Sequence, residues 1–236
     1  MWWIAEYEAV TLFSLKMSAA TASGGKTLLV PTPYAVKMAL LDAACRTAGV
    51  AQAEQWWPAI RDLRVALRPA EQVVVTNLFQ KVLRPRRNVA DLASPDAGPF
   101  QKTIGYREYV QWVGPLGIAL GGNEVMPGDW LCDLLVNISY LGKRGGFVQL
   151  IEPPGRAETL PPGFVEATTV ADSFPIEGTL QPLDDCLPPL TFAKANIYSG
   201  EKVRVGKERI TRPIVLPYRL IRASKSFTLY TRVDRT

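Results

Sequence analysis

Three groups of basic residues have the composition and spacing to contact the phosphates of a nucleic acid. The largest spans Lys81 to Arg107 and contains Lys81, Arg84, Arg86, Arg87, Lys102 and Arg107, opposed only by Asp91 and Asp96. Guanidinium groups match phosphate oxygens with paired hydrogen bonds. Pro85, Pro95 and Pro99 exclude a helix here. The pattern predicts a basic finger at the tip of a strand pair, with a solvated hairpin as the alternative.

The other two groups are less distinctive. Lys143 and Arg144 stand between glycines in Gly142-Lys-Arg-Gly-Gly146, where a backbone without side chains can approach a phosphate that the two cations hold. The third group lies around Tyr198 and contains Lys194, Lys202, Arg204, Lys207, Arg209 and Arg212. Glu201 and Glu208 weaken its field, which favours a plain surface ribbon.

Lys37 is a single cation beside the apolar stripe of an expected helix. Thr32 suits the N-cap and Pro33 suits the first turn of that helix, which we expect to run from Pro33 to Ala48. One turn from the positive end of the helix, Lys37 is placed to meet an anion such as a phosphate. The alternative is a lysine that extends its ammonium group to water.

The composition limits the function. The chain has 236 residues, enough for one sizeable core or two small ones, and 27 Lys and Arg against 22 Asp and Glu give a net charge of +5. This excess suggests a basic face. The chain has no histidine, which excludes Ser-His-Asp hydrolysis, His-ligated zinc and histidine-based RNA cleavage. We expect no cofactor and no metal.

The cysteines and apolar segments predict a soluble cytoplasmic protein. Cys45, Cys132 and Cys186 are odd in number and widely spaced, as expected of reduced core residues. Glu6 and Glu8 interrupt the first apolar run, which argues against a signal peptide. No apolar segment approaches the roughly 20 residues that a membrane-spanning helix needs.

The expected elements alternate in a β-α-β-β-α-β order. Strands are expected at Trp2 to Leu15, Arg64 to Leu67, Gln72 to Leu83, Tyr106 to Leu120 and Phe147 to Ile151. Helices are expected at Pro33 to Ala48 and Met126 to Tyr140, with a short helical or turn segment at Ala53 to Leu63. This order is typical of the ferredoxin-like, RRM-type fold of the α+β class. In that fold two helices cover one sheet face, and the other face or its loops remain available.

Beyond Glu152 many prolines interrupt regular structure. Apolar residues lie between them, namely Phe164, Val165, Phe174, Ile176 and Leu180, so we expect an ordered meander packed on the main domain. Two strands follow, at Ile214 to Tyr218 and Phe227 to Val233. We divide the chain into an RRM-like domain at 1–151 and a proline-rich insertion with a β-rich end at 152–236. Tyr106, Tyr109 or Trp112 could supply stacking platforms for bases.

Several of these segments resemble a known family. The helix sequence LLVPTPYAVKMALLDAA, the basic finger, the later SYLGKRGGFVQL and the closing PIVLPYRLIRASKSFTLYTRV are similar to the CRISPR-associated RAMP superfamily. The closest likeness is to the Cas-five subunit, which caps the 5′ handle of the guide RNA in type I Cascade complexes. The resemblance covers most of the chain and is weakest from Glu152 to Asp185.

This resemblance implies an RRM-like domain with a thumb hairpin at about 81–107 and a smaller β-rich C-terminal portion. It implies a non-catalytic subunit that binds the crRNA 5′ handle and contacts the Cascade backbone subunits and the large subunit, with target DNA near the PAM as a further candidate partner. Lys37, Lys143 and Arg144 would lie near the handle, and the six cations of the finger would lie on the thumb.

Two other functions stay open from the sequence. Some members of the family cut precursor RNA without a metal, and here Tyr34 and Lys37 would have to replace the usual histidine. The third hypothesis is a basic interaction module that binds an acidic protein or an anionic membrane and no RNA.

Overall fold

The structure is a computed structural model that describes residues 1–17, 24–86, 97–122, 129–169, 175 and 177–233. Its central sheet contains six strands: β1 (Trp2–Ala9), β3 (Arg64–Arg68), β6 (Leu116–Gly121), β7 (Val148–Leu150), β8 (Gly155–Ala157) and β9 (Val165–Glu166). The strand order is β7-β1-β6-β3-β9, with β8 also paired to β1. Neighbouring strands are antiparallel.

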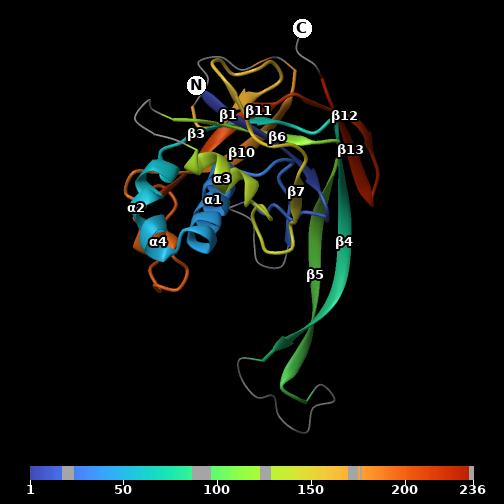
Figure 1. The fold of residues 1–236 in the computed structure, drawn as a ribbon. Helices are drawn as coiled ribbons and strands as arrows, with labels where there is room; N and C mark the ends of the chain where they lie inside the picture. The colour runs from blue at the N-terminus through green and yellow to red at the C-terminus, as the bar shows by residue number, and fades with distance from the viewer. Residues whose placement is uncertain (18–23, 87–96, 123–128, 170–174, 176, 234–236) are drawn as a thin grey trace.

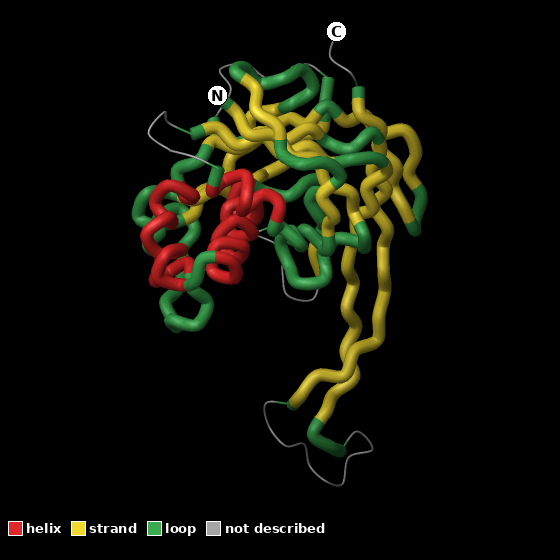
Figure 2. Tube along the Cα trace, in the orientation of Figure 1, coloured by secondary structure: helices red, strands yellow, loops and turns green. Residues whose placement is uncertain are grey.

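Four helices accompany the sheets in the described residues: α1 (Pro33–Thr47), α2 (Val50–Arg61), α3 (Trp130–Val136) and α4 (Phe192–Ala195). Figure 2 shows them gathered on one side of the molecule. The start of α1 is as predicted, because Thr32 Oγ1 accepts a hydrogen bond from the Ala35 amide at 3.1 Å and Pro33 occupies the first turn. The expected mixed class of helices and sheets is confirmed.

The two faces of the central sheet are covered differently. Alternate residues such as Ala5, Val65 and Ile118 join the main core with the buried residues of α1 and α3. The opposite face carries Trp2, Ala66 and Ala119, which pack with Ile4, Leu160 and Phe164. Gly117, also on this face, leaves room for the Phe164 ring. A Cβ atom at Gly117 would lie 2.8 Å from the Phe164 ring. This face is therefore covered, contrary to the expectation that it could remain available.

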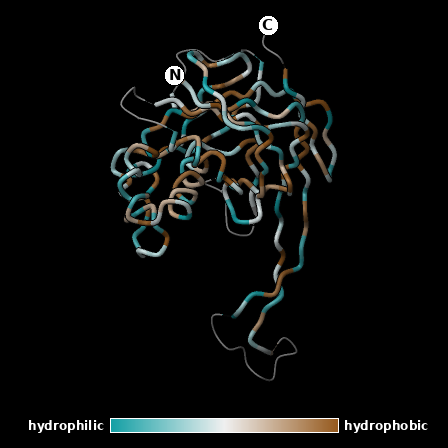
Figure 3. The backbone as a smooth tube through the Cα atoms, viewed as in Figure 1, coloured by the Kyte–Doolittle hydropathy of each residue, from teal (hydrophilic) through white to brown (hydrophobic). Residues whose placement is uncertain are grey.

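A long β-hairpin projects from the body of the molecule (Figure 1). It consists of β4 (Gln72–Pro85) and β5 (Phe100–Val113), and at its base β4 also pairs with β13 (Phe227–Arg232) and β5 with β2 (Gly24–Gly25). The fifth strand of this sheet is β12 (Tyr218–Ala223), at its edge. Beyond Phe79 and its partner Tyr106, which still pairs with β2, the described hairpin has only two strands. Hydrophobic and hydrophilic residues alternate along it (Figure 3).

The β-rich C-terminal part shares the main core. Strands β10 (Thr179–Cys186) and β11 (Arg209–Leu216) form a two-stranded sheet, and their Leu183 and Leu216 belong to the same buried cluster as α1. The expected meander is confirmed at Phe164, which covers the central sheet, and at Val165, which pairs with β3. Leu180 is 60% exposed, so its expected burial is wrong. Phe174 and Ile176 lie outside the described residues. The domain boundary after residue 151 stays a prediction.

Several predicted bounds need correction. The first strand ends at Ala9 and not at Leu15. The expected strand Tyr106 to Leu120 is two strands, β5 and β6, because Gly114 adopts a φ of +86° and Pro115 follows it. The described part of the second helix covers only Trp130–Val136, and residues 126 and 127 of the prediction lie outside the described ranges. At the C-terminal end there are three strands, β11, β12 and β13, where two were expected.

Candidate nucleic-acid interface

The hairpin displays its cations on both faces. The register pairs Lys81 with Ile104 and Leu83 with Lys102, so both lysines lie on one face, while Arg84 and Arg107 lie on the other. Lys81, Arg84 and Lys102 are exposed. Arg86 is half-buried and its Nε donates to the Phe100 carbonyl at 3.2 Å. The predicted site residue Arg87 lies outside the described residues.

The lysine face of the hairpin is also rich in exposed apolar side chains. Phe79 is 62% exposed, Leu83 63% and Ile104 52%, and all three share this face with Lys81 and Lys102. Exposed apolar and aromatic side chains between cations suit a ligand that has both anionic and planar apolar parts. A nucleic-acid strand is such a ligand.

At the base of the hairpin, three cations come together. Partial burial of the otherwise exposed Lys143, followed by the charges of Arg107 and Lys16, lowers its pKa from the ordinary value of 10.5. None of the three forms an ion pair with a residue that the structure describes. Mutual repulsion without a counter-charge destabilises the isolated protein and is relieved when an anion binds. We call Lys16, Arg107 and Lys143 the basic cluster.

Backbone contacts between distant segments assemble this cluster. Residue 16 forms a β-bridge with Thr27, and the nearby strand β2 pairs with β5 at Tyr106 and Arg107. Thr27 is fixed in turn because its amide donates to Glu108 Oε2 at 2.8 Å. The segment of Lys16 is thus held next to the base of β5. The sequence analysis missed Lys16, since its place depends on these crossings.

The glycine-rich loop between α3 and β7 presents Lys143 and Arg144, which are both exposed. Gly142 and Gly145 have φ angles of +77° and +102°, which L-residues rarely adopt. The Thr11 hydroxyl donates to the Gly145 carbonyl at 2.6 Å and accepts from the Phe147 amide at 3.0 Å, which ties the loop to the first strand segment. The glycines therefore shape a fixed turn that displays two cations, as the sequence predicted.

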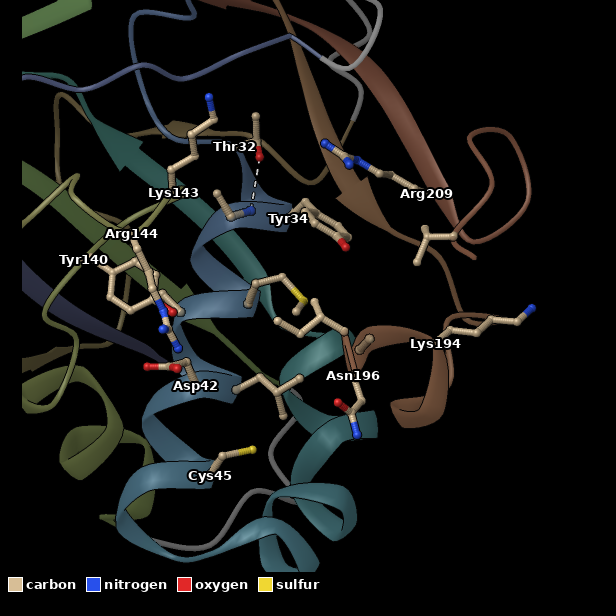
Figure 4. Close-up of a pocket in the computed structure, with 18 of the residues that line it drawn as sticks. Thr32, Tyr34, Asp42, Cys45, Tyr140, Lys143, Arg144, Lys194, Asn196 and Arg209 are labelled. Atoms are coloured by element: carbon tan, nitrogen blue, oxygen red, sulfur yellow. Dashed lines mark hydrogen bonds between the residues drawn. The ribbon is translucent and has the colours of Figure 1, made fainter. Parts of the chain in front are cut away.

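A groove of about 850 Å³ runs along α1 from this loop (Figure 4). At one end it is lined by Lys16, Lys143 and Arg144, and at the other by apolar residues of α1, α4 and the segment that follows α4. In Figure 4, Arg144 lies close to Tyr140 and Asp42 across the loop. The groove and the hairpin thus meet at the basic cluster, since Lys16 and Lys143 line the groove and the charge of Arg107 on the hairpin acts on Lys143.

Lys37 is placed differently from the prediction. Its side chain is only 2% exposed, and its Nζ donates to Asp185 Oδ1 at 2.6 Å. The ammonium group is buried because β10 supplies a carboxylate from a distant part of the chain. Lys37 is therefore neither extended to solvent nor open to an external phosphate, and both sequence interpretations of it are wrong.

Tyr34, the other residue considered for RNA cleavage, lies in the groove wall. Arg209 stacks over its ring at 4.2 Å from the centroid. Burial raises the pKa of Tyr34, and the charge of Arg209 offsets this only in part. A phenol with a raised pKa is a poor general base near neutral pH.

Half of the third basic group is paired with buried acids. Lys194 pairs with Glu208 at 2.5 Å, Arg209 with Asp184, and Arg212 Nε lies 3.8 Å from Asp185 Oδ2. The three acids are almost fully buried. Lys202, Arg204 and Lys207 are exposed. This group is thus half structural and half surface ribbon.

Of the three proposed aromatic platforms, Trp112 is unsuitable because it is buried. It is 5% exposed, stacks on Phe13 with 4.3 Å between ring centroids, and donates to the Leu29 carbonyl at 2.8 Å. Tyr109 is half-buried, whereas Tyr106 is 41% exposed on the lysine face of the hairpin. Of the three, Tyr106 is the best placed to stack on a base.

Among the described residues, no three His, Cys, Asp or Glu side chains gather as metal ligands. None of the helices in the described ranges is both long and apolar enough to cross a membrane. All three cysteines are free, and Cys45 and Cys132 are only partly buried whereas Cys186 is buried.

Comparison with known proteins identifies one curated protein of similar sequence. No protein-family model matches it. The CRISPR-associated protein Cas5 of Archaeoglobus fulgidus is 26% identical over 208 residues, which cover 84% of this chain and 86% of that protein. The chain is thus similar in sequence to Cas5. The resemblance to the CRISPR-associated Cas-five family is thereby confirmed.

Two solved structures also align along nearly the whole chain. A CRISPR protein from Archaeoglobus fulgidus aligns over 99% of this chain and 92% of its own, with 11% identity and a TM-score of 0.44. A chain of a CRISPR RNA-guided surveillance complex aligns over 99% and 91%, with 15% identity and a TM-score of 0.46. Both TM-scores are below 0.5, so the relationship to Cas5 rests on the sequence similarity.

Proposed function

We propose that this protein is a non-catalytic subunit of a type I CRISPR surveillance complex that binds the 5′ handle of crRNA. The observation that carries the proposal is the basic cluster of Lys16, Arg107 and Lys143, where partial burial and then the charges of the two neighbours lower the pKa of Lys143 and no described acid forms an ion pair with the three. The sequence similarity to Cas5, together with what the family resemblance implies, favours guide RNA as the anion. The same proposal includes the Cascade backbone and large subunits as partners and a cytoplasmic location.

We further propose that the central sheet is of the ferredoxin-like, RRM type. Without the short β8 and β9 its order is β7-β1-β6-β3, with α1 between β1 and β3 along the chain and α3 between β6 and β7. This is a β-α-β-β-α-β unit with the β4-β5 hairpin inserted between its middle strands. Because Phe164 and Leu160 cover the second face of the sheet, RNA would use the rim formed by the hairpin base and the groove.

The absence of catalysis is also part of the proposal. The two side chains considered for RNA cleavage do not meet the requirements: Lys37 is bound to Asp185 and the pKa of Tyr34 is raised. If incubation with repeat RNA gives a shorter product that disappears with Tyr34→Phe, this part of the proposal is wrong.

The main experiment measures binding of a repeat-derived RNA with its 5′ handle, over a range of salt concentrations. Charge reversal with Arg107→Glu or Lys143→Glu should weaken binding about tenfold or more, because a hydrogen bond to a charged group contributes about 1.5–3 kcal/mol. Loss of the ion pair with one phosphate should also make the slope of log affinity against log salt concentration shallower by about 0.7, the value for a single strand.

Arg219→Glu is the matched control. Arg219 is an exposed cation on β12, which lies three strands away from β5 in the same sheet. This variant should bind RNA as the unchanged protein does. Equal losses in all three variants would mean that only net charge matters. Indifference to RNA would instead favour a protein-interaction module. Equal affinity for RNA without the handle would exclude handle recognition.

A further inference from the structure

The segment after α4 exposes apolar side chains to an unusual degree. Tyr198 is 83% exposed and Ile197 is 80% exposed, the highest values for large apolar side chains in the described part of the chain. Val205, in the same loop, is 61% exposed. We call residues 197–205 the apolar loop. In Figure 1 it is the orange loop below α4. Exposed apolar patches of this kind mark binding surfaces.

Hydrogen bonds hold the apolar loop in a defined conformation. The Ser199 hydroxyl donates to the Ala193 carbonyl at 2.5 Å, and the Tyr198 amide donates to Asn196 Oδ1 at 3.0 Å. At its far end, the Arg204 amide donates to Glu208 Oε2 at 2.9 Å. The apolar side chains are therefore presented on a fixed backbone, which lowers the entropic cost of binding.

The apolar loop forms one wall of the α1 groove, at the end away from the basic loop. This end is lined by Met38, Cys45, Val50, Phe192, Ile197 and Val203. The groove lining also includes Tyr198 and Tyr34, but the Tyr34 ring is already covered by Arg209 and most of the other side chains at this end are aliphatic or contain sulfur, so Phe192 and Tyr198 are the rings left for a base to stack on. The nearest cations of the wall are already paired, Lys194 with Glu208 and Arg209 with Asp184. This end of the groove is poorly suited to RNA.

The rim of the patch carries more positive than negative charge, because Lys202 and Arg204 outnumber Glu201, which is also exposed and lines the groove. Lys202 and Arg204 are exposed in the apolar loop, and their side chains form no ion pair with any residue of the described ranges. An occupant that satisfies both the apolar wall and the rim must combine apolar side chains with carboxylates. A second copy of this chain, with a net charge of +5, is a poor match.

We propose that this end of the groove docks an acidic amphipathic segment of a partner protein. Its apolar side chains enter between α1 and the apolar loop, and its carboxylates pair with Lys202 and Arg204. This mode of recognition places an apolar face in a groove and fixes its orientation by charge at the rim. The proposal does not depend on RNA binding at the basic cluster.

The test uses the assembly that contains the chain, purified from its source cells. Tyr198 is replaced by photoreactive benzoylphenylalanine, and the crosslinked product is digested and sequenced by mass spectrometry. We expect a protein segment that contains both apolar and acidic residues. A crosslink to RNA, to a second copy of the chain or to a segment without acidic residues overturns the proposal, as does the absence of a crosslink.

Substitutions test the same interaction. Ile197→Glu should reduce the crosslink at least tenfold, and Lys202→Glu combined with Arg204→Glu should reduce it severalfold, while affinity for the handle RNA stays unchanged. Leu180→Glu is the control, because Leu180 is also exposed, at 60%, but lies on β10 outside the groove lining. If Leu180→Glu reduces the crosslink as much as Ile197→Glu, the apolar loop is not the docking surface.

Discussion

Removing either partner of the buried Lys37–Asp185 pair should destabilise the protein, but by unequal amounts. Asp185 has other hydrogen-bond and charge partners: its Oδ1 also accepts from the Cys186 amide at 2.8 Å, and Arg212 Nε lies 3.8 Å from its Oδ2. Asp185 is the only partner of Lys37 Nζ among the described residues. Deleting the carboxylate therefore leaves a buried charge alone, whereas deleting the ammonium group does not.

The magnitudes follow from this asymmetry. Asp185→Ala strands Lys37 and should cost about 3–5 kcal/mol of the free energy of unfolding, as expected when one partner of a buried pair is removed. Lys37→Met keeps the volume and leaves Asp185 with its other partners, so only the hydrogen bond to a charged group disappears, about 1.5–3 kcal/mol. The double variant Lys37→Met with Asp185→Leu should recover the part of the loss that comes from the isolated Lys37 ammonium group, although Arg212 Nε still loses the Asp185 carboxylate.

Urea unfolding measures these differences. With a slope of about 2–3 kcal/mol per molar, Asp185→Ala should lower the midpoint by about 1–2 M and Lys37→Met by about half of that. Equal losses, or a double variant as unstable as Asp185→Ala, would refute the reasoning from buried charge. Without urea, where the Lys37→Met variant is folded, its affinity for RNA should equal that of the unchanged protein. A tenfold loss of affinity under these conditions would mean that Lys37 contacts RNA.

Three further predictions concern single side chains. Because the pKa of Lys143 is lowered, this residue loses its charge before an ordinary lysine does as the pH rises. As the pH is raised towards the ordinary lysine value, binding of an RNA made only of A and C should thus begin to weaken at a lower pH than it does in Lys143→Arg. Trp57→Phe should lower the free energy of unfolding by about 1–3 kcal/mol in urea unfolding, since the buried Trp57 Nε1 donates to the Leu190 carbonyl at 2.7 Å; an unchanged midpoint would contradict this. Burial raises the pKa of Cys186 to about 12, so iodoacetamide at about pH 8 should modify it far more slowly than the partly exposed Cys45; equal rates by mass spectrometry would show that Cys186 is accessible.

The parts of the fold that could be predicted from the sequence are those specified by local signals. Thr32 and Pro33 define the start of α1 through the backbone geometry of a few residues, and the structure has the cap as predicted. The division between β5 and β6 was missed, although Gly114 and Pro115 are a turn signal. The apolar pattern continues on both sides of Gly114 and Pro115, so it predicts one long strand where the turn makes two.

The features that could not be predicted depend on contacts between distant segments. The partner of Lys37 lies 148 residues away, so nothing near Lys37 shows that its charge is neutralised. Lys16 joins the basic cluster only because its segment bridges to Thr27 next to the base of the hairpin. Lys81, Arg84 and Lys102 of the finger and both cations of the glycine-rich loop are exposed, but the sequence could not show that the charge of Arg107 acts on Lys143.

The length of the hairpin sets a minimum size for a ligand that contacts both of its ends. Along β5, Arg107 at the base lies six residue steps from Gln101, which pairs with Arg84 near the tip. At about 3.4 Å per residue this is about 20 Å, the rise of about six stacked nucleotides of one strand at 3.4 Å each. An oligonucleotide shorter than this reaches the basic cluster or the distal arginine, but not both. The length of the hairpin therefore limits how much affinity a longer oligonucleotide gains. The gain per added nucleotide should drop once the oligonucleotide reaches from the basic cluster to Arg84.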